Sequence, residues 1–143
     1  MLAAIPEDKK DYRPHPVSKT AMELAWHTAS SDLWFLDGVA QGAFAVDEGK
    51  MPAEIAGVAD LVRSYESKIG PAIAQVKALS DEQLLKPIPF FGVMNEPAVT
   101  YLSWLLVHGI HHRGQLSTYL RAMGAKVPSI YGGSADEPFQ APA

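Results

Sequence analysis

Apolar and small residues recur every three to four positions between Thr20 and Gly42, which is the spacing of an α-helix with one buried face. Thr20 and Glu23 also have the spacing of a capping box, in which each side chain accepts a hydrogen bond from the other residue's backbone N–H. We therefore expect a helix that begins near Thr20 and ends in the Gly42 region. Its inward row consists of Leu24, His27, Ser31, Trp34, Phe35 and Gly38.

A second apolar stripe predicts another long helix that begins near Pro52. Proline is tolerated in the first helical turn because the N–H that it lacks would have no partner there. Gly70 and Pro71 interrupt the stripe and predict a kink, since a proline inside a helix removes one hydrogen bond and clashes with the preceding turn. The expected buried positions are Ile55, Val58, Ala59, Val62, Glu66, Ile69, Ile73 and Val76.

Proline-bearing segments divide the rest of the chain. Residues 6–16 are charged and predict a surface connector, and the tail after Pro128 has no period and predicts a loop. Ser80 and Gln83 form a second capping box, which predicts one short turn of helix. Residues 86–97 contain too many prolines for a helix and too little alternation for a strand, so we expect an apolar loop over the helices.

The last long helix is predicted from Ala98 to about Met123, with Gly124 as a terminating residue in left-handed backbone. Its inward row consists of Tyr101, Leu105, His108, His112, Gln115 and Tyr119. Together these patterns predict an all-α fold, a helical bundle.

Length and composition limit the classes of protein. The 143 residues, with 48% hydrophobic and 20% charged residues, predict one globular domain over 1–143. The net charge of −4 and the scattered basic residues argue against direct nucleic-acid binding. The chain has no stretch typical of a signal peptide or a membrane span and no cysteine, which fits a cytoplasmic protein. Any metal site must use histidine nitrogens or carboxylate oxygens.

The histidines carry the clearest candidate chemistry. His108 and His112 are four residues apart, so on a helix they share a face and can bind one ion. His27, on the inward row of a different helix, is the candidate third ligand. Three imidazoles with a position left open are typical of a reactive zinc, nickel or similar site.

Other interpretations of these residues stay open. A histidine on an apolar face is often a core residue that is hydrogen-bonded to a carbonyl. His111 could bind in place of His112, although it lies toward the flank of the stripe. Glu23 and Glu66 could orient a ligand or act as a base. Gln115 and Ser31 are candidates for hydrogen bonds to the ligands, and the aromatic side chains are expected to form core and lid.

Several runs of the sequence resemble the DinB/YfiT-like family. The C-terminal signature is similar over residues 108–116, 119–124 and 127–132, and the N-terminal ligand region is similar over 13–16 and 23–27. The family pattern of one histidine near the start of the second helix and His-x-x-x-His in the fourth falls on His27, His108 and His112. His111 matches an extra histidine that is frequent in the family and is not its usual ligand.

The resemblance implies an up-down-down-up four-helix bundle, a three-histidine site for zinc or nickel, and a homodimer. It also implies activities such as thiol S-transfer with bacillithiol, mycothiol or glutathione, because an ion with open positions could orient a thiol toward an electrophile. Residues 2–5 look like the final turn of a first helix that is short or missing. We expect the groove left open to be covered by a second subunit, or the natural chain to begin upstream.

Three functions compete at this point. The first is a metal-dependent enzyme, a transferase or hydrolase acting on a small molecule such as a low-molecular-weight thiol. The second is a non-catalytic metal-binding protein of stress response or DNA-damage induction. The third is a helical interaction module whose histidines are ordinary core residues. Metal ligands at His27, His108 and His112 would separate the first two from the third.

Overall fold

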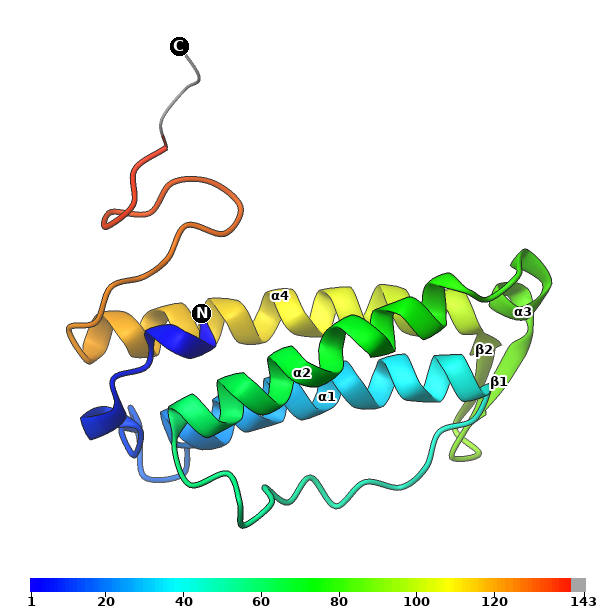
Figure 1. Cartoon of the computed structure of the whole chain (residues 1–143), viewed down its shortest axis with the longest axis horizontal. Coiled ribbons are helices and arrows are strands. Elements are labelled where there is room, and N and C mark those ends of the chain that lie inside the picture. The colour runs from blue at the N-terminus through cyan, green and yellow to red at the C-terminus, as the bar shows by residue number, and fades with distance from the viewer. Residues whose placement is uncertain (140–143) are drawn as a thin grey trace.

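The computed structural model describes residues 1–139, and within them the chain forms three long helices, one short helix and a two-stranded hairpin (Figure 1). None of the helices in this part of the chain is long and apolar enough to cross a bilayer. The elements are η1 (Leu2–Ala4), η2 (Glu7–Lys9), α1 (Ala21–Gln41), α2 (Val58–Lys77), α3 (Asp81–Leu85), β1 (Pro87–Phe90), β2 (Met94–Pro97) and α4 (Ala98–Ala122).

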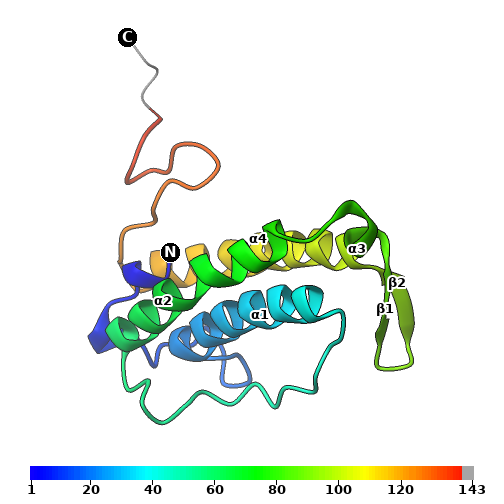
Figure 2. The ribbon, with the colours of Figure 1, turned by 45° about the vertical axis from the view of Figure 1, so that its right-hand side comes forward.

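Helix α1 lies at the centre of the bundle and packs against both α2 and α4. Helices α1 and α2 run in the same direction and α4 runs in the opposite one (Figures 1 and 2). This arrangement confirms the predicted all-α helical bundle. The short 3-10 helix η1 occupies the place of the expected first helix, and Ile5 after it is buried. Residues 42–57, called the strap below, run back along α1 to the start of α2 (Figure 2).

The predicted helix caps are confirmed. Thr20 Oγ1 accepts a hydrogen bond from the Glu23 N–H at 3.1 Å, and the Glu23 carboxylate accepts one from the Thr20 N–H at 2.7 Å. Gly42 ends α1 and Gly124 follows α4, both in left-handed backbone with φ near 70°. The second capping box, at Ser80, opens the short helix α3 as expected.

The predicted start of α2 near Pro52 is wrong, because the helix begins at Val58. Gly57 precedes it in extended backbone, and the Glu7 carboxylate accepts a hydrogen bond from the Val58 N–H at 2.9 Å. A Cβ atom on Gly57 would lie 2.6 Å from that carboxylate. A contact between distant segments therefore sets this boundary. The helix continues through Pro71, so the proline does not break it.

The predicted buried positions are correct at Ile55 and Val58 and wrong at Ala59, Glu66 and Ile73, which are exposed. Counting from Val58, the inward positions fall at Leu61 and Tyr65, one residue before the glutamate, because each residue turns the helix by about 100°. The second half of α2 leaves an open groove toward α4. Its apolar walls include Leu36, Ile69, Ile73, Leu102, Leu105 and Leu106.

The loop predicted for residues 86–97 is instead an antiparallel β-hairpin. The Ala98 N–H donates to the Lys86 carbonyl at 3.1 Å, so Lys86 is a hydrogen-bonded position of the ladder. Because these positions alternate along an antiparallel pair, the backbone nitrogens of Pro87 and Pro89 point away from the partner strand. A missing N–H costs nothing there. Left-handed backbone at Phe91 and Gly92 closes the turn.

Two apolar clusters flank the middle of the contact between α1 and α4. One is mainly aliphatic and lies at the N-terminal end of α1, with Leu24, Leu61 and Leu120 among its buried members. The other is aromatic and lies beneath the hairpin, with Phe35 and Tyr101 at its centre. The inward histidines lie between these clusters, on rigid helical backbone.

Candidate metal centre

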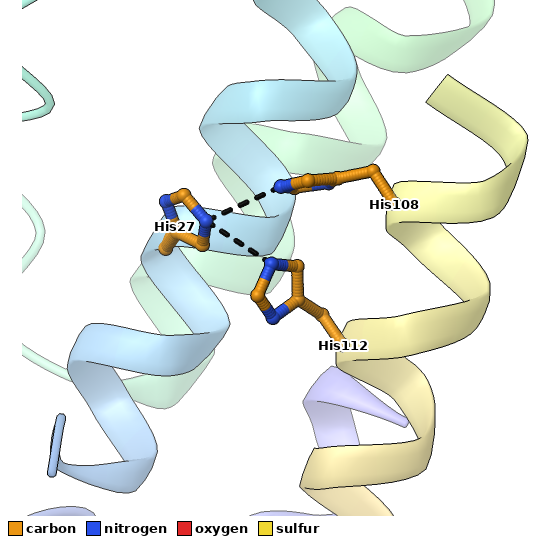
Figure 3. A group of neighbouring side chains, drawn as sticks. All are labelled: His27, His108 and His112. Atoms are coloured by element: carbon orange, nitrogen blue, oxygen red, sulfur yellow. Dashed lines mark hydrogen bonds between the residues drawn. The ribbon is translucent and has the colours of Figure 1, made fainter. Parts of the chain in front are cut away.

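Three histidines meet where α1 crosses α4. His27 lies on the second turn of α1, and His108 and His112 lie one turn apart on the facing side of α4 (Figure 3). The Nε2 atom of His27 is 3.2 Å from the Nε2 atoms of both His108 and His112. All three candidate ligand atoms lie within 4.8 Å of one another. The structure thus brings together the three side chains that the sequence pointed to.

The donor set fits a divalent transition metal. Two nitrogens that bind one zinc ion at about 2.0–2.1 Å in tetrahedral geometry are about 3.3 Å apart. The observed separation of 3.2 Å is close to this value. Hydrogen bonds alone do not satisfy the cluster, because a single Nε2 proton on His27 can donate to only one of its two neighbours. A cation would accept all three lone pairs.

Burial keeps the three imidazoles neutral at pH 7. It lowers the pKa of His108 from 6.5 to about 4, with a further contribution from the neighbouring histidines. Burial also lowers the pKa of His27 and His112. Neutral imidazole is the form that binds a metal, since a ligand must first lose its proton.

A side-chain amide orients one of the three rings. The Nδ1 atom of His112 lies 2.7 Å from Gln115 Oε1, so the ring donates its Nδ1–H and keeps the Nε2 lone pair for the cluster. The expectation of a hydrogen bond between Gln115 and a candidate ligand is thereby confirmed, with Gln115 as the acceptor. The Nδ1 atom of His108 is buried and has no hydrogen-bond partner among residues 1–139.

The other candidates lie outside this cluster. His111 is exposed and does not join the group of three. Glu23 is held in the capping box of α1, and Glu66 faces solvent on α2. Ser31 lines a cavity beside His27. Within residues 1–139, its hydroxyl makes no hydrogen bond to any of the three imidazoles.

That cavity, called the aromatic pocket below, has a volume of about 400 Å³. It lies between α1, the strap and the tip of the hairpin. Its lining residues are His27, Ser30, Ser31, Trp34, Val46, Asp47, Gly49 and Phe91. The sequence indicated core and lid roles for the aromatic residues, but it gave no sign of the wall formed by the strap.

A polar network lies on the other side of α1 and was missed by the sequence analysis. Tyr65 on α2 donates its hydroxyl hydrogen to the Asp32 carboxylate at 2.8 Å. Burial raises the pKa of Asp32, while the Tyr65 hydrogen bond and the Arg113 charge oppose the shift. Arg113 in turn contacts the ring and hydroxyl of Tyr131. These residues come from four separate segments, so no local spacing could reveal them.

Comparison with protein-family models matches residues 1–140 to the DinB family. The chain belongs to the DinB family. The resemblance seen in the sequence is therefore confirmed. The uncharacterized protein YjoA of Bacillus subtilis is one relative of this DinB family chain. It is 27% identical over 122 residues, which cover 84% of this chain and 77% of YjoA. The uncharacterized protein YrdA of the same organism is 28% identical over 127 residues, covering 82% and 70%.

Solved structures of DinB-like proteins share the fold. The crystal structure of the DinB-like protein YjoA from Bacillus subtilis superimposes with a TM-score of 0.75 at 26% identity, covering 91% of this chain and 86% of that one. A DinB-like protein from Bacillus cereus gives a TM-score of 0.69 at 27% identity, covering 92% and 86%. The helical bundle is thus that of DinB-like proteins.

Proposed function

We propose that this DinB family chain is a divalent-metal-binding protein in which His27, His108 and His112 hold one zinc or nickel ion. The observation that carries the proposal is the convergence of their Nε2 atoms, with 3.2 Å between His27 and each of the other two. Three protein nitrogens are the ligand number of reactive zinc sites, and imidazole suits nickel as well. The lowered pKa values support the same assignment, because they keep the donors free of protons.

We further propose that the centre belongs to a metal-dependent enzyme that acts on a small molecule. A bound ion would supply Lewis acidity. The chain itself fixes the donors on two packed helices, orients His112 through Gln115, and places the aromatic pocket directly beside His27. Thiol S-transfer and hydrolysis, which the family resemblance implies, are the reaction classes to test.

The metal assignment is tested by elemental analysis of the purified protein after dialysis. We expect one ion per chain in the wild type and loss of that ion in His27→Ala, His108→Ala and His112→Ala. His111→Ala is the matched control, because it removes an exposed imidazole from the same helix. An ion retained by all three ligand variants, or absent from the wild type after zinc and nickel loading, would overturn the assignment.

The enzymatic assignment needs a separate assay. Glutathione, bacillithiol and mycothiol are supplied with an electrophile, and simple esters serve as hydrolysis substrates. Activity in the wild type and in His111→Ala, together with its loss in His108→Ala, supports the enzyme. A protein that binds metal yet converts none of these substrates favours the non-catalytic stress-protein alternative.

We also propose that a second copy of the chain packs on α4. Leu106, Val107 and Ile110 keep 59%, 64% and 45% of their surface exposed. Contiguous apolar surface of this kind is typical of an interface. Light scattering is expected to give the mass of a dimer for the wild type and of a monomer for Val107→Glu. Val17→Glu is the control, since Val17 is 88% exposed and lies outside α4. A monomeric wild type would refute the dimer.

A further inference from the structure

The aromatic pocket has walls that α1 alone could not provide. The indole N–H groups of Trp26 and Trp34, two turns apart on α1, donate to the strap carbonyls of Gly49 at 2.9 Å and Ala45 at 2.8 Å. These two bonds hold the strap against the helix on either side of the cavity. The stretch of strap between them supplies Val46 and Asp47 as the opposite wall. The cavity is therefore a built part of the fold, and its volume of about 400 Å³ falls in the range of small-molecule sites.

Flat apolar surfaces dominate one end of this pocket. The rings of Trp34 and Phe91 are parallel to within 2°, with 6.3 Å between their centroids, and both line the cavity. Val46 is 82% exposed and Phe91 48% exposed, so apolar surface is left open to solvent around the cavity. Burying such surface under a ligand is favourable because it removes apolar area from water. Parallel ring planes favour a ligand that is itself flat.

Acceptor groups dominate the polar part of the same pocket. The Asp47 carboxylate uses one oxygen to accept the Gly49 N–H at 3.0 Å, and within the described residues its other oxygen makes no hydrogen bond. The hydroxyl of Ser30 is turned to the His27 carbonyl at 3.3 Å. Next to Asp47, a ligand group that donates hydrogen bonds or carries positive charge is therefore favoured over an anionic group, which the carboxylate would repel.

We propose that the aromatic pocket binds the substrate, a small molecule with a flat apolar body and a polar end that donates hydrogen bonds. The body packs against Trp34 and Phe91, and the donor faces Asp47. His27 closes one side of the cavity, so the ligand is held next to the histidine cluster. This inference rests on the proposed function, because it names the substrate class of that site.

Three matched probes test the two chemical features separately. Binding of 2-phenylethylamine is compared with that of 2-cyclohexylethylamine, which keeps the amine and loses the flat ring, and of 3-phenylpropanoate, which keeps the ring and reverses the charge. Titration calorimetry uses the full chain as purified, with its metal content measured on the same sample. We expect 2-phenylethylamine to bind about tenfold more tightly than 2-cyclohexylethylamine, the ratio that one good aromatic contact supplies, and about threefold more tightly than 3-phenylpropanoate, the scale of an exposed ion pair.

Variants locate the probe. Phe91→Ala, at the exposed hairpin tip, is expected to weaken 2-phenylethylamine binding about tenfold. Asp47→Asn is expected to weaken it about threefold, since it removes one exposed charge. Phe139→Ala is the control because Phe139 is 75% exposed and lies outside the pocket. Thermal unfolding checks that each variant is folded. Equal binding of the three probes, or unchanged binding in both pocket variants, would overturn the proposal.

The same samples separate this proposal from the metal assignment. Probe binding is repeated after removal of the metal with a chelator. If the probe binds but no ion is ever found, the metal assignment fails and the pocket stands. If an ion is bound but the probe shows no preference for a flat donor, the pocket proposal fails and the metal assignment stands.

Discussion

The two sides of α1 differ in how their polar groups are used. On one side, the aromatic pocket combines exposed apolar walls with a carboxylate, Asp47, that keeps an oxygen without an internal partner in the described structure. On the other side, Asp32 is already bound by Tyr65 and lies near the Arg113 charge. A helix turns by about 100° per residue, so Asp32 faces away from the side that carries His27 and Ser31.

The pocket side of α1 therefore has polar groups that are available to a ligand, whereas the polar groups on the Asp32 side stabilise the fold. Polar groups that bind one another gain little from a ligand, and they cost free energy when one partner is removed. Polar groups without internal partners can gain a hydrogen bond from a ligand at no such cost. Substitutions on the Asp32 side are therefore expected to change the stability of folding, and those on the pocket side to change binding.

The largest effect is expected from Tyr65→Phe, which leaves the half-buried Asp32 carboxylate without its hydroxyl donor. A hydrogen bond to a charged group contributes about 1.5–3 kcal/mol, so we expect a loss of that order in the free energy of unfolding by denaturant. Zinc affinity should change less than in the three ligand variants, because Asp32 and His112 interact through their charges without a hydrogen bond between them. Tyr119→Phe, which removes an exposed bond to the Lys19 carbonyl, is the matched control. A large loss of zinc affinity in Tyr65→Phe would contradict the assignment of the Asp32 side to folding stability.

A smaller effect is expected from Gln115→Leu, which removes the acceptor that orients His112. Loss of such a partner typically weakens metal binding by about 10- to 100-fold, and we expect the lower end because Gln115 is exposed. Competition with a zinc chelator measures the change. Stability without metal should stay within about 0.5 kcal/mol of the wild type, as for other exposed positions. Gln75→Leu on α2 is the control, and an equal loss of affinity in both variants would remove the special role of Gln115.

The sequence predicts best where the information is local. The capping box at Thr20 and the glycine at Gly124 fix helix ends through neighbouring residues, and both were found as expected. The spacing of His108 and His112 placed them on one face, and packing of α1 on α4 brought His27 to them. Whether the three hold an ion stays a prediction for the metal analysis.

The misses share a dependence on distant contacts. Helix α2 begins where Glu7 meets Val58, which the pattern around Pro52 could not show. The prolines of residues 86–97 argued against strands, yet the register of the hairpin places Pro87 and Pro89 where no N–H is needed. The aromatic pocket and the Asp32 network were missed for the same reason, because each joins segments that are far apart in the chain.

The last prediction concerns pH, where His108 on α4 and Asp32 on α1 are expected to act with opposite sign in the metal-free protein. The pKa of His108 is lowered by burial from 6.5 to about 4, so the unfolded chain takes up a proton first on acidification. The neutral His108 imidazole therefore contributes fully to the free energy of unfolding above about pH 6.5, and this contribution is lost as the pH falls toward 4. Asp32 does the reverse, because burial raises its pKa and protonation favours the folded state. Urea unfolding between pH 7 and 4 should show a shallower decline in His108→Ala than in the wild type and a steeper one in Asp32→Asn, and parallel declines in all three proteins would contradict both assignments.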